Sequence, residues 1–140
     1  MNDKYNILIV DDNKETVAGL KSFLDEKYNT VGAYDGLEGI QIFEDDKEGI
    51  DLVITDLVMP SISGVALIEI IKKKYPETPI VAITGWGHHP KALASEAKAD
   101  VILDKPFEME ELLQALEKIF SKTHSKRGTS RPLPKKANER

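Results

Sequence analysis

Five side chains able to take part in ionic chemistry stand just after, or at the end of, short apolar runs in this 140-residue sequence. Asp11 and Asp12 follow the first run, and Asp56 follows the third. Thr84 ends the fourth run, and Lys105 comes just after the fifth. If these runs are parallel strands, their carboxyl ends meet at one edge of a sheet, where open α/β proteins carry their binding and catalytic sites. The sequence therefore predicts three carboxylates, a hydroxyl and an ammonium group at a single site.

Three crowded carboxylates repel one another unless a cation lies between them. Oxygen ligands of this kind suit Mg²⁺, which binds carboxylates, carbonyls, waters and phosphate oxygens. One carboxylate could then attack phosphorus and form an aspartyl phosphate. Such a transfer depends on positioned cations more than on proton transfer, and Mg²⁺ and Lys105 would supply the positive charge. The predicted chemistry is therefore phosphoryl transfer to an aspartate.

Each of these residues also has an ordinary structural interpretation. An Asp-Asp pair after a strand can be a helix N-cap. Thr84 can be a strand-end hydroxyl, and Lys105 can be a solvated surface charge. The functional interpretation depends on all of them falling at the carboxyl ends of the first, third, fourth and fifth apolar runs.

The elements that must position these residues alternate along the chain. The apolar runs are rich in Ile and Val, as buried parallel strands are, and they cover Tyr5–Val10, Thr30–Tyr34, Leu52–Thr55, Ile80–Thr84 and Val101–Leu103. Helical spacing of apolar residues marks Asn13–Lys27, Gly36–Asp46, the segment around Leu67–Tyr75 and Met109–Phe120. The segment His89–Lys98 has a weaker apolar stripe and is expected to be a thin helix.

Five strands alternating with five helices give a (βα)5 order. Crossovers between parallel strands are right-handed almost without exception, so the helices must cover both faces of the sheet. The expected fold is α/β, a doubly wound flavodoxin-like three-layer sandwich, with its parallel five-stranded sheet in the order 2-1-3-4-5.

Composition limits the class of protein. The chain is 41% hydrophobic, and its length suits one domain. It has no cysteine, which excludes disulfides and thiolate metal sites. No run approaches the ~18 apolar residues of a membrane helix, and the N-terminal run is too short for a signal peptide. A cytoplasmic protein is expected.

The charge is divided unevenly between the globular region and the C-terminal end. The net charge is −5, yet residues 121–140 carry seven basic residues and one acidic residue, a charge of +6, which leaves −11 on the rest. This end has almost no apolar residues, and such composition favours disorder. We expect a domain over residues 1–121 and a basic, disordered tail or linker stub over residues 122–140.

Four motifs make the chain resemble the receiver domain of two-component response regulators, including the stand-alone CheY-like type. They read ILIVDDN, DLVITDLVMPSISG, VAITG and ILDKPF, and the resemblance covers about residues 4–121. It implies a flavodoxin-like fold and phosphotransfer from the phosphohistidine of a sensor histidine kinase or phosphotransfer protein, with Mg²⁺ as cofactor.

The resemblance also implies a role for each residue that matches the family pattern. Asp56 matches the phosphoacceptor, and Asp11 and Asp12 match the acidic pair that holds Mg²⁺. The backbone carbonyl of Val58 matches a further metal ligand, and Thr84 and Lys105 match the residues that contact the phosphoryl group. Pro106 matches a proline whose preceding peptide bond is usually cis. Pro60 and Gly64 match the turn and the helix start after the acceptor.

Three positions depart from the family pattern. Ile102 stands where the switch residue of the fifth strand is usually aromatic, so a rotating ring cannot report movement of Thr84. Gly85 stands where alanine is frequent and leaves room beside the acceptor. Trp86 is bulky for its position, where it could cover the site or dock a partner, or be an exposed loop aromatic.

Signalling through partner binding is the predicted function, without enzymatic activity beyond self-catalysed phosphotransfer and dephosphorylation. The downstream protein is expected on the face of helix four, strand five and helix five, which includes Ala92–Ala97, Ile102 and the region of Leu113. Membrane binding is not expected, nor is direct binding of nucleic acid.

Four alternatives remain open from sequence alone: a receiver fragment of a longer regulator, a phosphate sink or relay intermediate, a phosphohydrolase and a flavodoxin. A haloacid-dehalogenase-type phosphohydrolase would need a second aspartate two residues after Asp56, where Val58 stands. A flavodoxin would need a phosphate loop after the first strand, where Asp11 and Asp12 would repel the phosphate of FMN.

Overall fold

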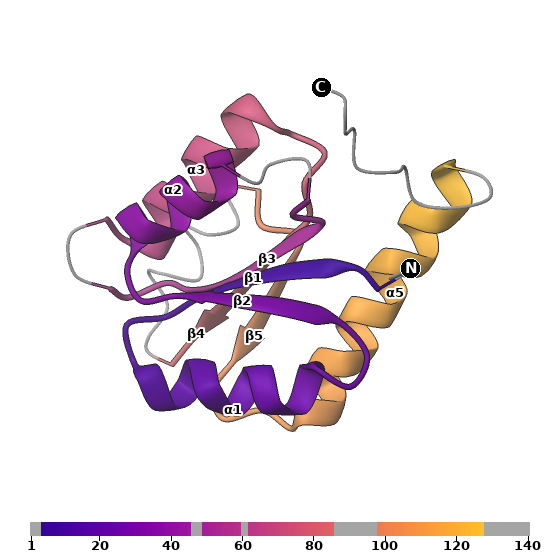
Figure 1. Ribbon diagram of the computed structural model, residues 1–140, viewed down its shortest axis with the longest axis horizontal. Helices are drawn as coiled ribbons and strands as arrows, with labels where there is room; N and C mark the ends of the chain where they lie inside the picture. The colour runs from indigo at the N-terminus through magenta and orange to yellow at the C-terminus, as the bar shows by residue number, and fades with distance from the viewer. Residues whose placement is uncertain (1–3, 46–48, 60–61, 86–97, 128–140) are drawn as a thin grey trace. The chain divides into compact units, whose positions relative to one another are not determined.

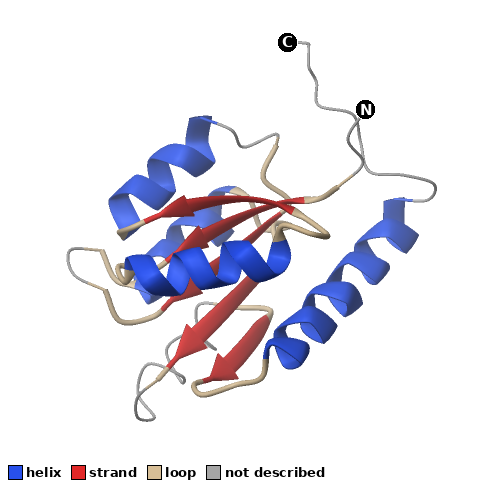
Figure 2. Ribbon diagram, turned by 60° about the horizontal axis from the view of Figure 1, so that its bottom comes forward, coloured by secondary structure: helices blue, strands red, loops and turns tan. Residues whose placement is uncertain are grey.

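The computed structural model describes residues 4–45, 49–59, 62–85 and 98–127, and the chain divides into two compact units, Met1–Pro106 and Phe107–Arg140. The first unit contains one parallel sheet, ordered β2-β1-β3-β4-β5 (Figures 1 and 2). Its strands are β1 (Asn6–Val10), β2 (Asn29–Ala33), β3 (Leu52–Asp56), β4 (Ile80–Thr84) and β5 (Val101–Asp104). This is the order that the alternating pattern predicts.

Helices of the first unit cover both faces of the sheet, as the right-handed crossovers require. α1 (Lys14–Leu24) lies on one face, and α2 (Gly36–Asp45) and α3 (Gly64–Lys74) lie side by side on the other (Figure 1). The three layers of the predicted sandwich are therefore present. The expected helix near His89–Lys98 lies almost wholly outside the described residues.

The three inner strands account for the strongest apolar runs of the sequence. Every residue of β3 and β4 is buried, and so are Ile7–Val10 of β1. The outer strands β2 and β5 are only partly buried along most of their length. The acidic site is thus carried by β1 and β3, two neighbouring inner strands that are paired in register.

The core between the sheet and the α2–α3 layer is closely packed. Phe43 of α2 lies edge-on to Tyr75, with 5.1 Å between ring centroids, beside the buried Leu67 and Ile68 of α3. Burying one such aliphatic or aromatic side chain contributes about 1.5–3 kcal/mol. This packing holds α3, and with it the loop that follows β3, against the sheet.

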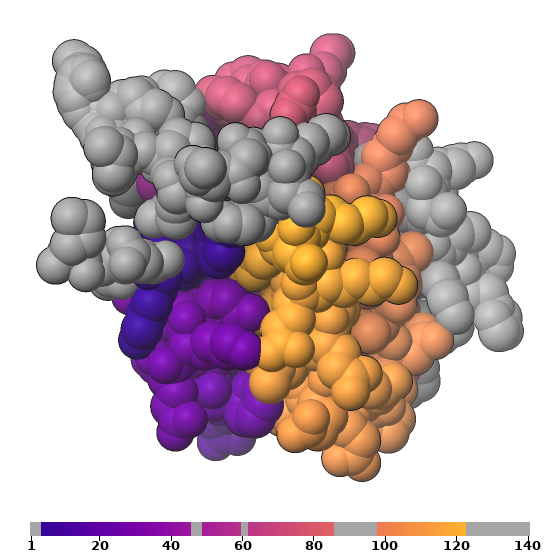
Figure 3. Space-filling view, turned by 90° about the vertical axis from the view of Figure 1, so that its right-hand side faces the viewer, coloured from indigo at the N-terminus to yellow at the C-terminus, as the bar shows by residue number. Residues whose placement is uncertain are grey.

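The second unit contains α5 (Met109–Arg127), which begins with two acidic residues in its first turn. Carboxylates in the first turn interact favourably with the positive end of the helix dipole. Residues 109–122 of this helix are orange to yellow in the space-filling view (Figure 3). Among the helices that the structure describes, none combines the length and hydropathy needed to cross a bilayer.

Candidate phosphoacceptor site

The end of β1 places two carboxylates at the carboxyl edge of the sheet. Asp11 is buried, and its Oδ1 accepts a hydrogen bond of 2.9 Å from the backbone N–H of Asn13. Asn13, not the Asp-Asp pair, caps α1, because its side chain accepts from the backbone N–H groups of Glu15 and Thr16. The helix start therefore leaves both Asp11 and the exposed Asp12 available for the site.

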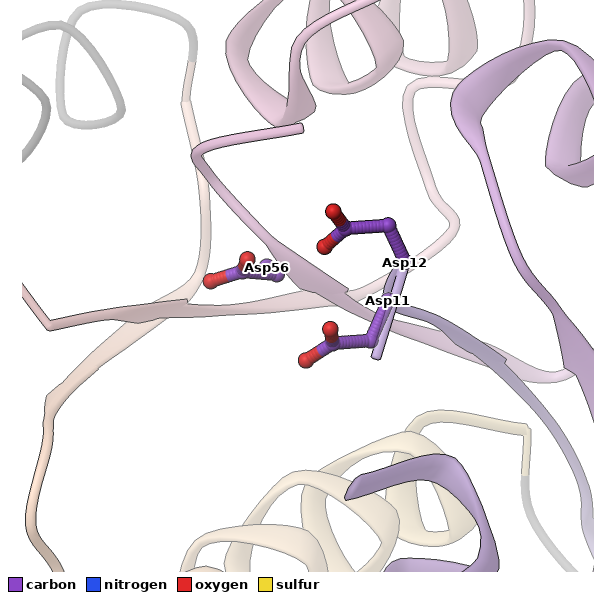
Figure 4. Close-up of side chains that lie close together, drawn as sticks. All are labelled: Asp11, Asp12 and Asp56. Atoms are coloured by element: carbon purple, nitrogen blue, oxygen red, sulfur yellow. The ribbon is translucent and has the colours of Figure 1, made fainter. Parts of the chain in front are cut away.

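Asp56 ends β3 beside these two residues. All three carboxylates point into the same space, as Figure 4 shows, and one oxygen from each lies within 4.8 Å of the others. Asp56 is 9% exposed, so a small reagent can reach it although most of the residue is buried. The structure thus brings together the three acids that the sequence predicts.

Lys105 approaches the cluster from the end of β5. Its Nζ lies 3.7 Å from Oδ1 of Asp56, an ion pair at long range. Its backbone N–H donates to the carbonyl of Thr84 at 2.7 Å, and the bond from Lys105 to Pro106 is cis. The side chain is 38% exposed, so it can move toward a group arriving from solvent.

Thr84 and Gly85 continue β4 past the point where Ile83 pairs with Asp56. Thr84 is buried. A Cβ atom on Gly85 would lie 3.3 Å from Cδ of Lys105, so the glycine leaves room for the lysine stem. The predicted hydroxyl and ammonium groups thus come from adjacent strand ends.

Of the other predicted residues, the structure describes Val58 and Ile102, and several lie outside the described chain. Val58 follows Asp56 by two residues and is 53% exposed, and Ile102 in β5 packs against the core cluster. Pro60, Trp86 and the segment Ala92–Ala97 lie outside the described residues.

Burial and mutual repulsion disfavour the charged forms of the acids. Burial, followed by the charge of Asp11, raises the pKa of Asp56 from its ordinary value of 3.8 to about 6, although Lys105 acts in the opposite direction. Burial also raises the pKa of Asp11, against the hydrogen bond from Asn13. Because both values are raised, desolvation and repulsion outweigh the nearby lysine.

These shifts predict how the stability of the metal-free protein depends on pH. Since the folded pKa of Asp56 exceeds its unfolded value, the folded state binds more protons between about pH 4 and pH 6. The free energy of unfolding should therefore fall by up to about 3 kcal/mol as the pH rises from 4 to 7. Urea unfolding in EDTA across this range measures the effect, and stability that climbs with pH through the same range would contradict it.

The donor set fits Mg²⁺. Three carboxylates converge, and in the described part of the chain no histidine or cysteine joins them. Mg²⁺ prefers oxygen ligands and typically uses one or two carboxylates with several waters. A cation placed among these oxygens would offset the repulsion that raises their pKa values.

One residue that contacts the acceptor backbone is not marked by any of the sequence motifs. Thr55, inside the apolar run before Asp56, is fully buried and donates its hydroxyl to the Asp56 carbonyl. The available signal was a hydroxyl residue within a run of otherwise apolar residues.

A parallel 2-1-3-4-5 sheet with clustered acids at its carboxyl edge defines the class of CheY-like α/β signalling domains. The sequence profile described as "Response regulator receiver domain" matches residues 7–117. The chain belongs to the family of response regulator receiver domains. The predicted family, fold and receiver function are thereby confirmed.

Individual relatives agree with this assignment. The transcriptional regulatory protein CpxR of Escherichia coli K12 is 32% identical over 120 residues, which cover 84% of this chain and 50% of CpxR. A receiver domain of Clostridium thermocellum has a TM-score of 0.81 at 29% identity, over 86% of this chain and 98% of its own. The chain spans about half the length of CpxR, so the match concerns the receiver portion alone.

A third relative was solved as a complex that contains Mg²⁺ and BeF3. The structure of the CheX-CheY-BeF3-Mg+2 complex from Borrelia burgdorferi has a TM-score of 0.75 at 27% identity, over 83% of this chain and 89% of that one.

Proposed function

We propose that Asp56 accepts a phosphoryl group in a Mg²⁺-dependent reaction. The observation that carries this proposal is the convergence of the Asp11, Asp12 and Asp56 carboxylates, with Lys105 Nζ 3.7 Å from the acceptor. Asp11 and Asp12 are then available for a metal, and Asp56, which is 9% exposed, can offer one oxygen to the metal and the other to a phosphodonor.

The transfer requires an ionised Asp56. One of its carboxylate oxygens attacks phosphorus, a P–O bond forms, and the P–N bond to the imidazole of a phosphohistidine donor breaks. The electron pair of that bond returns to the imidazole nitrogen. Lys105 moves toward the arriving phosphoryl oxygens, and the Thr84 hydroxyl donates to them. Positive charge and hydrogen-bond donors held in advance are what such transfers require.

Asp11, Asp12, Asp56 and the backbone carbonyl of Val58 would hold the metal. When bound, Mg²⁺ supplies positive charge that offsets the acidic cluster and the oxygens of the transferred group. The relative crystallised with Mg²⁺ and BeF3 supports this assignment, because its fold matches 83% of this chain with a TM-score of 0.75.

The phosphorylated domain acts by binding other proteins, and hydrolysis of its own aspartyl phosphate is the only turnover. The phosphodonor is a sensor histidine kinase or phosphotransfer protein of the cytoplasm. The downstream partner binds a surface that includes β5 with Ile102, and residues 1–121 form the receiver domain. Phosphorylation shifts an existing equilibrium toward the binding-competent form. Ile102, which packs against the core cluster, has no ring that could rotate in this shift.

A small phosphodonor tests the acceptor directly. Incubation with acetyl phosphate and Mg²⁺ should add one phosphoryl group to the chain, with the modification mapped to Asp56 by peptide mass spectrometry after borohydride reduction. In EDTA the rate of labelling should fall by a factor of about 100 or more, since no metal cation then offsets the negative charge of the transferred group.

Asp56→Asn should not be labelled, and its matched control is Asp45→Asn, which changes an exposed carboxylate at the end of α2 to an amide. The rate at which Asp45→Asn is labelled should equal that of the wild type. Labelling that is independent of Mg²⁺, or that maps to another acidic residue, would refute the proposal.

A further inference from the structure

Thr55 is a polar residue in a fully buried strand. All five residues of β3 are buried, and Thr55 is 0% exposed. Its hydroxyl donates a hydrogen bond of 2.8 Å to the carbonyl oxygen of Asp56. Buried hydroxyls need such a partner, because leaving one unpaired costs about 1–3 kcal/mol. The partner here is the backbone of the acceptor residue itself.

This contact completes the restraint of one peptide group. The peptide that joins Asp56 to Leu57 is held at its oxygen by Thr55. At its nitrogen, Leu57 donates to the carbonyl of Ile83 in β4 at 3.0 Å. Since peptide groups are planar, fixing both ends sets the orientation of the whole unit.

The next peptide group is restrained as well. The carbonyl of Leu57 accepts a hydrogen bond of 3.1 Å from the N–H of Gly64, at the start of α3. The side chain of Leu57 is buried in the core cluster, whereas Val58 beyond it is exposed. The path from the acceptor to the Val58 carbonyl is therefore set by backbone contacts and by the side-chain hydroxyl of Thr55.

We propose that Thr55 is a positioning residue for the phosphoacceptor site. Its hydroxyl fixes the peptide after Asp56 and thereby sets the acceptor carboxylate and the Val58 carbonyl relative to Asp11 and Asp12. The inference rests on the proposed phosphoacceptor function and adds a residue that touches neither metal nor phosphoryl group. Without the hydroxyl, the peptide gains freedom that metal binding must then remove.

A purely structural role would predict something different. If Thr55 only filled space in the core, valine would serve as well, because it has the same shape and β-branching. If the hydroxyl only contributed stability, its loss would lower the melting temperature without changing the affinity of the folded protein for Mg²⁺. Site geometry and global stability can therefore be separated.

Three substitutions isolate the hydroxyl. Thr55→Ser keeps it, whereas Thr55→Ala and Thr55→Val remove it. The serine and alanine variants both lose the same methyl group, so they differ only in the oxygen, and both leave room for folding if valine overcrowds the strand.

Three measurements apply to each variant. Calorimetric titration with Mg²⁺ should show affinity about 3- to 10-fold weaker for the alanine and valine variants, the range expected for one lost neutral hydrogen bond. Labelling by acetyl phosphate should slow by a similar factor. Amide hydrogen exchange of Leu57 in the metal-free protein should accelerate, and the serine variant should match the wild type within about twofold.

Val53→Ala is the control for stability, because it removes apolar contacts from the same strand without touching the acceptor peptide. It should lower the melting temperature and leave Mg²⁺ affinity unchanged. Wild-type Mg²⁺ affinity in the alanine and valine variants would overturn the inference, as would a serine variant that binds Mg²⁺ as weakly as the alanine variant. A wild type that fails to be labelled would instead overturn the proposed function, so the two failures are distinguishable.

Discussion

Asp56→Asn is expected to abolish labelling by acetyl phosphate and to raise the free energy of unfolding of the metal-free protein by about 2 kcal/mol at pH 7–8. The amide lacks the anionic oxygen that attacks phosphorus, so transfer cannot begin. The amide also removes a buried charge next to Asp11. Because the pKa of Asp56 is raised to about 6 despite the nearby Lys105, the desolvation and repulsion of the ionised carboxylate exceed its attraction to the lysine.

The gain in stability should depend on pH in a defined direction. At pH 7–8 the wild-type carboxylate is ionised in the folded state, so the variant is more stable. At pH 4–5 the carboxylate is already protonated, so the difference should shrink toward zero. Urea unfolding in EDTA at both pH values gives the comparison, with Asp45→Asn as the exposed control. A variant less stable than the wild type at pH 8 would show that Asp56 is held by favourable contacts instead.

Gly64→Ala is expected to destabilise the domain by more than about 3 kcal/mol. A Cβ atom at position 64 would overlap the carbonyl oxygen of Asp56 and would lie 2.7 Å from the Cα of Leu57. Both neighbours are backbone atoms that cannot rotate away. The α3 start and the acceptor loop must therefore separate, which also removes the hydrogen bond from Gly64 to Leu57.

Gly19→Ala is the matched control, because a Cβ atom at that position meets nothing within 4 Å. Alanine inside a helix is favoured over glycine, so this variant should gain about 0.5–1 kcal/mol. Thermal unfolding of the two variants should move in opposite directions. At temperatures where Gly64→Ala still folds, its Mg²⁺ affinity should also be reduced, and wild-type stability in that variant would show that the loop can shift freely.

Most of the fold follows from the apolar runs. Strand bounds agree within one residue, since each inner strand must be apolar on both faces. β2 was predicted over Thr30–Tyr34, but it covers Asn29–Ala33 because Asn29 pairs with Asn6 of β1. This pairing register cannot be read from the local sequence pattern. In α5 the apolar periodicity stops at Phe120, while the helical backbone continues to Arg127.

The acidic site could also be predicted from the sequence, because the strand order alone brings the ends of β1 and β3 together. The sequence could not provide the distance between Lys105 and Asp56, which depends on how the fifth strand ends. It could not show that Asn13 caps α1 and thereby frees the acidic pair. Nor could it distinguish Thr55 from an ordinary strand threonine, because the hydroxyl acts on the backbone of its own neighbour.

The acids and the lysine stand on strands that differ in their resistance to local opening. Asp11 and Asp56 extend from the inner strands β1 and β3, whereas Lys105 follows β5, a four-residue outer strand that is only partly buried. Local fluctuations begin where few apolar contacts oppose them, so the outer strand should open more readily than the inner ones. Asp11 and Asp56 should therefore keep their positions while Lys105 moves away from them. The net charge near the acids can then change without local unfolding of the inner strands.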